Sequence, residues 1–252
     1  MLRRLTERLT RDWTLRRQLP QEFGSAPILV TPSAGLRYLA RSMNDVDPVL
    51  MNLVREFVRP KSVVWDIGAN VGLFTFAAAS LAGPEGQVMA MEPDAWLVQL
   101  LRRSAKLQPP GSAPVKIVPA AVASGLALRT LCLAERSRAA NYLAEFGTIQ
   151  TGGAREEQTI VALTLDWMLD FAPSPSLIKI DVEGAELEVL RGSFRLFEAC
   201  RPIVLCEVIP DTAPEVTEFF SSRGYQIFDG EIEPAKRQPL DLAPWSTLAI
   251  PA

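Results

Sequence analysis

The chain has 252 residues, of which 48% are hydrophobic, and this length and composition predict a globular protein with one large domain and a substantial core. Its formal net charge of −3 argues against broad nucleic-acid binding, which requires a clustered surplus of basic side chains. Because the chain contains no histidine, the usual general base, the usual zinc ligand and any Ser-His or Cys-His nucleophile pair are excluded.

The first 19 residues have the pattern of a basic amphipathic helix. Leu2, Leu5, Leu9 and Trp13 recur at helical intervals, and arginines surround them. Such a helix can lie on an anionic membrane surface or bind an acidic partner. Packing on its own domain or on a second subunit is the favoured alternative, because acidic residues dilute the charge and the apolar stripe is narrow. The sequence thus allows a homodimer contact through this segment.

Residues 20–46 are interrupted by Pro and Gly, with short strand candidates at 28–30 and 36–39 about a turn. Asp47 then caps a predicted helix over 48–58, which Pro60 ends. We therefore divide the chain into two parts. An N-terminal extension of amphipathic helix and hairpin covers 1–46, and the main domain covers 47–252.

From residue 61 onward, strand and helix patterns alternate, which is typical of a parallel sheet covered on both faces. The predicted fold class is an α/β doubly wound, mostly parallel sheet. Residues 134–158 lose all periodicity, which predicts a long surface loop or lid. The expected strands are 62–67, 87–92, 115–118, 126–133, 159–163, 177–181, 202–207 and 225–228, with 245–250 as a last edge strand. The expected helices are 72–81, 93–107 and 214–223.

Residues 63–72 combine an apolar strand, an acid and a glycine-rich turn directly before a helix. Glycine lets the backbone turn sharply near a ligand, and the helix directs its free N–H groups there. The dinucleotide fingerprint G-x-G-x-x-G binds a pyrophosphate, whereas this chain has Asp66-x-Gly68-x-x-x-Gly72. An acid repels phosphate and attracts an ammonium group. The turn therefore favours S-adenosyl-L-methionine, which has an ammonium and a ribose but no phosphate.

A second acid supports this prediction. Glu92 ends the next strand and follows Gly72 by 20 residues, a spacing at which a carboxylate accepts hydrogen bonds from both ribose hydroxyls. The alternative is that the glycines only form a tight turn and that Glu92 only leads a helix. The predicted cofactor-binding residues are Asp66, Gly68, Ala69, Asn70, Gly72, Glu92, Pro93 and Ala121.

The strand over 177–181 carries the candidate catalytic acids. With period two, Asp181 emerges at the carboxyl end of a central strand, where open α/β sheets bind ligands. Glu207 ends the following strand in the same way. Glu183 either acts at the site or only complements the dipole of the next helix. Asp181 is the first candidate general base, Glu207 the second, and Glu183 completes the set.

Several runs together resemble the FkbM family of S-adenosylmethionine-dependent methyltransferases. They are Val-Trp-Asp-Ile-Gly-Ala-Asn-Val-Gly at 64–72, Glu92-Pro93, Thr-Leu-Asp at 164–166, Ile-Lys-Ile-Asp-Val-Glu-Gly-Ala-Glu at 178–186, Leu-Arg-Gly at 190–192, and Arg201-Pro202 with Glu207. The resemblance covers about 49–208. It implies a seven-stranded class I methyltransferase sheet and O-methylation of a hydroxyl on a sugar, glycolipid or polyketide-type product. Such an enzyme would serve natural-product or glycan biosynthesis.

Three alternatives remain open at this stage. A nicotinamide-dependent oxidoreductase would share the sheet, and a catalytically inactive subunit would share the S-adenosylmethionine site. Converging acids also allow a Mg²⁺ ion that orients the acceptor and lowers its pKa. Mg²⁺ is possible but not favoured, since no acid pair has a spacing that demands a metal, so metal ligands stay unassigned.

Cysteine usage and the first residues bear on location. Cys132, Cys200 and Cys206 are odd in number, lack C-x-x-C spacing and lie in apolar surroundings, which is typical of a reducing compartment. Residues 1–19 have no signal-peptide core, and no apolar run is long enough to span a membrane. The sequence therefore predicts a cytoplasmic protein.

Overall fold

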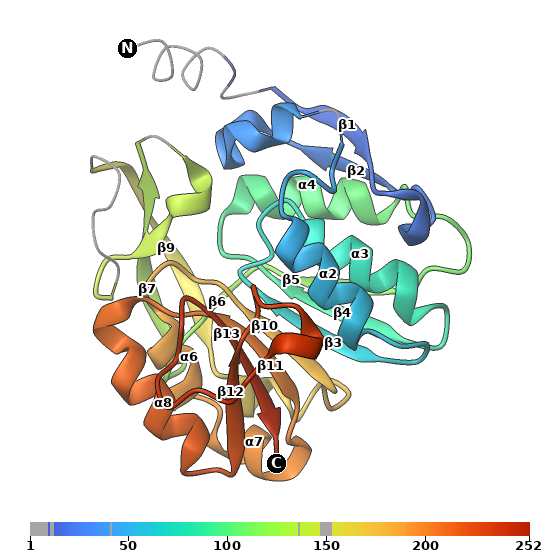
Figure 1. Ribbon diagram of the computed structural model, residues 1–252. Coiled ribbons are helices and arrows are strands. Elements are labelled where there is room, and N and C mark those ends of the chain that lie inside the picture. The colour runs from blue at the N-terminus through green and yellow to red at the C-terminus, as the bar shows by residue number, and fades with distance from the viewer. Residues whose placement is uncertain (1–9, 11–12, 41, 136, 147–152) are drawn as a thin grey trace.

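A seven-stranded sheet runs through the protein, seen in a computed structural model that describes residues 10, 13–40, 42–135, 137–146 and 153–252 (Figure 1). The strand order is β12-β13-β11-β10-β3-β4-β5. All neighbours pair in parallel except β13, which is antiparallel to β11 and β12. The predicted α/β class is confirmed. The strands are β3 (Val63–Ile67), β4 (Gln87–Met91), β5 (Val115–Val118), β10 (Leu177–Ile180), β11 (Ile203–Glu207), β12 (Tyr225–Asp229) and β13 (Ser246–Pro251).

Helices cover both faces of this sheet, because alternate strand residues are apolar on each side. In β10, Leu177 packs with one set of helices, while Ile178 and Ile180 pack with the other. The first set contains α2 (Pro48–Phe57), α3 (Leu73–Ala82) and α4 (Ala95–Ala105). The second contains α5 (Leu165–Met168), α6 (Glu186–Arg191), α7 (Phe194–Cys200) and α8 (Ala213–Ser221).

The order of the strands creates a crevice at the carboxyl ends of two central strands. The chain runs outward from β3 to β4 and β5, and then returns to β10 on the other side of β3. Helices therefore leave the adjacent ends of β3 and β10 towards opposite faces, which opens a crevice outside their carboxyl ends. Asp66 and Asp181 lie at these two strand ends.

A smaller sheet adjoins the main one, with strand order β6-β9-β7-β8. Its strands are β6 (Ala121–Val122), β7 (Ala127–Ala134), β8 (Tyr142–Leu143) and β9 (Ala154–Leu163). Six short 3-10 helices connect described elements: η1 (Gln21–Phe23), η2 (Pro32–Ala34), η3 (Leu36–Leu39), η4 (Arg138–Ala140), η5 (Pro210–Thr212) and η6 (Pro234–Lys236).

This smaller sheet corrects the expected loop over 134–158. Strand β9 begins at Ala154, five residues before the expected strand at Thr159, and pairs with β7. The first residues of β9 are mostly polar, because one side of the strand faces solvent. They therefore lack the apolar alternation by which a strand is predicted. Pairing with β7 supplies the backbone hydrogen bonds that a local pattern does not reveal.

The N-terminal extension also differs from the prediction. Residues 1–9 and 11–12, most of the expected helix and of the expected dimer contact, lie outside the described residues. Leu15–Gln18, however, forms strand β1 instead of a helix, and it pairs with β2 (Pro27–Val30). Leu36–Leu39, expected as a strand, is the 3-10 helix η3. The hairpin therefore consists of β1 and β2 and lies one segment earlier in the chain than expected. Its first strand was not predicted, because helical periodicity does not reveal that β1 pairs with β2. The division at residue 46 remains our proposal.

The C-terminal strand is not at an edge. β13 lies between β11 and β12, and Leu248 and Ala249 are fully buried in it. An apolar strand pattern does not distinguish an edge from an interior position, since both depend on which partners the fold supplies. In the part of the chain that the structure describes, no helix is long and apolar enough to span a membrane.

Candidate active site

The turn after β3 has a backbone shape that requires its glycines. Gly68 and Gly72 have φ of 79° and 90°, and Asn70 has φ of 52°. A Cβ on Gly68 would lie 1.8 Å from the carbonyl oxygen of Asp181. The turn therefore runs directly against the end of β10, and α3 starts behind it with its free N–H groups.

Glu92 connects this turn to the next strand. Its Oε2 accepts a hydrogen bond from the backbone N–H of Asn70 at 2.8 Å, and its Oε1 accepts one from the backbone N–H of Asp94 at 2.8 Å. Burial raises the pKa of Glu92 to about 8, and its two backbone hydrogen bonds oppose that rise. The carboxyl group is thereby held at the crevice in one orientation.

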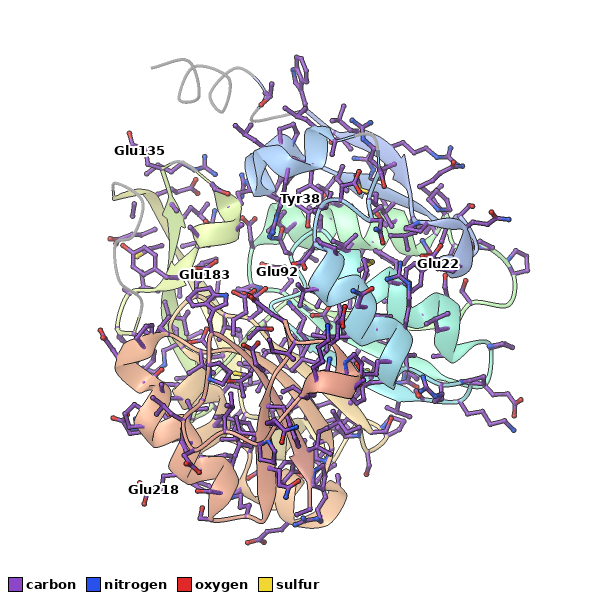
Figure 2. The ribbon with its side chains drawn as sticks, viewed as in Figure 1. Glu22, Tyr38, Glu92, Glu135, Glu183 and Glu218 are labelled. Carbon is purple, nitrogen blue, oxygen red and sulfur yellow. The ribbon has the colours of Figure 1, made fainter. Side chains whose placement is uncertain are left out.

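A pocket lies on the β4 side of the crevice, which we call the glycine-turn pocket. It contains about 630 Å³ of space, part of it open to solvent. Figure 2 shows two of its acids, Glu92 and Glu183, in the middle of the molecule. Its polar residues include Asn70, Glu92, Asp181 and Glu183, and its apolar residues include Met91, Ala121, Leu131 and Leu143.

Residues from the segment predicted as a loop or lid line the glycine-turn pocket. Arg138, Asn141 and Tyr142 line it. The guanidinium of Arg138 donates to the buried carboxylate of Asp94, and Asn141 Nδ2 donates to the same oxygen at 3.0 Å. Arg138 also lies 5.1 Å from the ring centre of Trp96. Asp94 therefore connects the segment after β7 to the start of α4. Residues 136 and 147–152 of this segment are not among the described residues.

A buried ion-pair network lies beneath the crevice. Lys179 Nζ is 3.3 Å from Asp66 Oδ1 and 3.2 Å from Asp181 Oδ2, and it donates to the carbonyl of Gly68 at 2.9 Å. Burial alone lowers the pKa of Lys179, but Asp181 and Asp66 raise it above its ordinary value, so the group stays an ammonium. Thr75 Oγ1 donates to the other oxygen of Asp66.

A second pocket, which we call the Trp245 pocket, lies on the β11 side of the crevice. It contains about 1030 Å³ of space, part of it open to solvent. Tyr38 enters from the N-terminal extension, where Figure 2 labels it, and Trp245 from the start of β13. Its charged residues are Arg37, Asp47, Lys179, Asp181, Glu207 and Glu231.

Two further acids of the crevice, besides Glu92, have raised pKa values. Burial, then the charge of Asp181, raises the pKa of Glu207 to about 7. Burial, then the charge of Asp181, raises the pKa of Glu183 to about 8. Glu183 also has φ of 54°, an uncommon backbone conformation for a residue other than glycine. Crowded carboxyl groups with a pKa near neutrality are typical of functional sites.

The predicted site residues meet at this crevice, although not all face it. Gly68, Asn70, Glu92, Pro93, Ala121, Asp181 and Glu183 line the glycine-turn pocket, while Ala69 and Glu207 line the Trp245 pocket with Asn70 and Asp181. Asp66 and Gly72 line neither.

The direct cofactor contact expected of Asp66 stays a prediction, and the structure gives the protein partners of this residue. Its side chain is fully buried and holds Lys179 and Thr75. Gly72 also lies behind the wall, where a Cβ would approach the ring of Phe76 to 2.5 Å.

The sequence did not predict several residues that line the crevice. Lys179 shares a strand face with Asp181, so period two indicated its position but not its partners. Arg37 and Trp245 come from opposite ends of the chain, and only the fold brings them to one pocket. Asp166, in the Thr-Leu-Asp run, has a structural role, since its carboxylate accepts from the backbone N–H groups of Arg195 and Leu196 at the start of α7.

A comparison with known families decides the identity of this arrangement. The family described as the methyltransferase FkbM domain matches residues 66–227. This match covers more than half of the chain. The chain belongs to the FkbM methyltransferase domain family. The fold class and the resemblance seen in the sequence are thereby confirmed.

A curated relative in the same comparison is the hexuronic acid methyltransferase AglP of Haloferax volcanii. It is 26% identical over 177 residues, which cover 68% of this chain and 66% of AglP. The match thus spans slightly less than two thirds of the relative's length.

Solved structures with a similar chain course include a methyltransferase FkbM from Methylobacillus flagellatus. It has 16% identity and a TM-score of 0.48, and the match covers 79% of this chain and 49% of that one. Another is the fibrillarin of Aeropyrum pernix in complex with S-adenosyl-L-methionine, with 12% identity, a TM-score of 0.44, and coverage of 77% and 67%.

The cofactor of this site is S-adenosyl-L-methionine. The residues present fit it, because the apolar wall of the glycine-turn pocket suits an adenine ring and Glu92 is placed for ribose hydroxyls. The buried Oδ1 of Asn70 has no hydrogen-bond partner among the described residues, and it offers an acceptor to the cofactor's ammonium. No group of three or more acidic or cysteine side chains in the described ranges is arranged to hold a metal ion.

Proposed function

We propose that the protein is an S-adenosyl-L-methionine-dependent O-methyltransferase that acts on a hydroxyl of a sugar, glycolipid or polyketide-type molecule. The observation that carries this proposal is the contact between the two pockets. Asn70 and Asp181 line both the glycine-turn pocket and the Trp245 pocket. A cofactor in the first pocket and an acceptor in the second would therefore meet at Asp181.

The chemistry asks little of the protein beyond placement and proton removal. Bound S-adenosyl-L-methionine supplies a methyl group on a good leaving group. The chain aligns the acceptor with that methyl group and excludes water from the crevice. As the acceptor oxygen gains the methyl group it loses its proton, and a carboxylate within hydrogen-bond reach accepts it. Asp181 is the first candidate for this role and Glu207 the second.

Lys179 supports these acids instead of acting as a base. Its raised pKa keeps it protonated; its Nζ donates to the carbonyl of Gly68 and forms ion pairs with Asp66 and Asp181. It therefore fixes the orientation of the Asp181 carboxylate. The relative AglP, whose name describes methylation of a hexuronic acid, supports the sugar part of the proposal.

The test compares Asp181→Asn with the wild type on a panel of glycosides, glycolipids and polyketide-type alcohols, measuring release of S-adenosylhomocysteine. We expect kcat to fall by about 10²–10⁴ with little change in cofactor affinity. Asp170→Asn is the matched control, because Asp170 is half-exposed and pairs with Arg195 away from both pockets. An Asp181→Asn variant with wild-type turnover would exclude Asp181 as base and as metal ligand.

Two further measurements separate the alternatives. Calorimetric titration with S-adenosylhomocysteine and with NADH distinguishes a methyltransferase from a nicotinamide oxidoreductase, and we expect binding of the first alone. Turnover of the wild type after EDTA treatment tests for an essential metal, and we expect it to persist. Cofactor binding without turnover of any acceptor would favour an inactive subunit.

A further inference from the structure

The Trp245 pocket has a composition that suits a sugar ring, and the inference here rests on the function proposed above. Trp245 is 50% exposed although it lines the pocket. An indole face presented beside polar groups packs against the C–H face of a sugar, while carboxylates and a tyrosine accept or donate hydrogen bonds at the ring hydroxyls. Tyr38, Glu207 and Glu231 supply those polar groups.

The two cations of this pocket are already opposed by acids. Lys179 forms ion pairs with both Asp66 and Asp181, and it donates a hydrogen bond to the carbonyl of Gly68. Arg37 Nη1 lies 3.9 Å from Asp47 Oδ2. Each of the two cations therefore lies beside a carboxylate that also lines the pocket.

The remaining charges of the pocket are negative. In the described part of the chain, Glu207 and Glu231 form no ion pair and accept no side-chain hydrogen bond, although both line the pocket. Asp181 and Glu207 line the same pocket; burial, then the charge of Asp181, raises the pKa of Glu207 to about 7, while Lys179 opposes that rise. An anionic acceptor would add to this repulsion, whereas hydroxyl groups would find unoccupied acceptors.

We propose that the Trp245 pocket binds a non-anionic glycoside, with Trp245 as the stacking platform and Glu231 as the residue that rejects hexuronates. This specificity differs from the acceptor class named for AglP. The catalytic centre is the one proposed above. Selection between neutral and anionic acceptors comes from the loop between β12 and β13 and from the end of β11.

The experiment uses the full chain saturated with S-adenosylhomocysteine and two probes, methyl β-D-glucopyranoside and methyl β-D-glucuronide, which differ at one carboxylate. Affinities are measured by saturation-transfer NMR at millimolar probe concentrations. We expect the glucoside to bind at least about fivefold more tightly than the glucuronide. Trp245→Ala should weaken the glucoside by about tenfold, while Trp167→Ala, an exposed tryptophan outside the pocket, should not.

Glu231→Gln tests the charge directly, because it removes one negative charge and keeps the shape. It should reduce the difference between the two probes by at least about twofold. The matched control is Glu233→Gln, since Glu233 lies on the same loop but pairs with Lys236 at 2.7 Å and does not line the pocket.

Each outcome has one meaning for this proposal. Equal or tighter binding of the glucuronide overturns the charge selection, and binding of neither probe overturns the sugar platform. A Glu231→Gln variant that keeps the full difference removes Glu231 from the mechanism. Calorimetry with S-adenosylhomocysteine on the same samples is independent of these results, and its failure would count against the proposed function instead.

Discussion

Replacing Lys179 by methionine should destabilise the fold more than any exposed ion pair could. The ammonium lies within 3.3 Å of two carboxylates and donates to the Gly68 carbonyl at 2.9 Å. Asp66 is fully buried, so the variant leaves its charge without a compensating cation. Breaking a buried pair in this way costs about 3–5 kcal/mol, and this is the loss of unfolding free energy that we expect.

Urea unfolding followed by circular dichroism measures this loss, with Lys236→Met as the control. The Lys236 ammonium lies 2.7 Å from Glu233, closer than any Lys179 pair, but both side chains are 73% exposed. An exposed pair contributes about 0–1 kcal/mol, because water and salt screen it. The comparison therefore separates burial from distance.

A double-mutant cycle with Asp66→Asn identifies the cause. If the uncompensated Asp66 charge is responsible, the double variant should recover about 1–3 kcal/mol relative to the sum of the single losses. A Lys179→Met loss below about 1 kcal/mol, or additive single losses, would refute this account of the crevice.

The remaining predictions concern the crevice itself. If Glu207 is the base, kcat should rise with pH and reach half its plateau near the Glu207 pKa of about 7, where the carboxyl loses its proton; a flat profile would exclude it. If Glu92 accepts hydrogen bonds from the ribose hydroxyls, they favour the ionised form of this carboxyl group, whose pKa burial raises to about 8. S-adenosylhomocysteine should therefore release a proton on binding below that pH and bind more tightly as pH rises towards it, which calorimetry in buffers of different ionisation enthalpy detects. Gly68→Ala should destabilise by about 2–5 kcal/mol and weaken the cofactor, because of the positive φ and the clash with Asp181, whereas Gly125→Ala, with nothing within 4 Å, should do neither.

The sequence by itself determined the features that depend on local chemistry. Strand and helix alternation predicted the parallel sheet, since both faces of each strand are apolar. Asp47 was predicted to cap the helix after it, and its Oδ1 accepts from the backbone N–H of Leu50 at 2.9 Å. The spacing of the glycine turn and Glu92 predicted that both serve one cofactor, and the two are neighbours, since Glu92 accepts a hydrogen bond from the backbone N–H of Asn70 in that turn.

Only the tertiary structure decided which side chains contact one another at these strand ends. An acid at the end of β3 was expected to face the ligand, but Asp66 points into the core because Lys179 and Thr75 supply its partners. Strand β13 entered the interior of the sheet, since pairing partners and not apolar pattern choose a strand's neighbours. The Trp245 pocket joins Arg37, Glu207 and Trp245, which are far apart in the chain, and no local sequence pattern indicates a contact that exists only after folding.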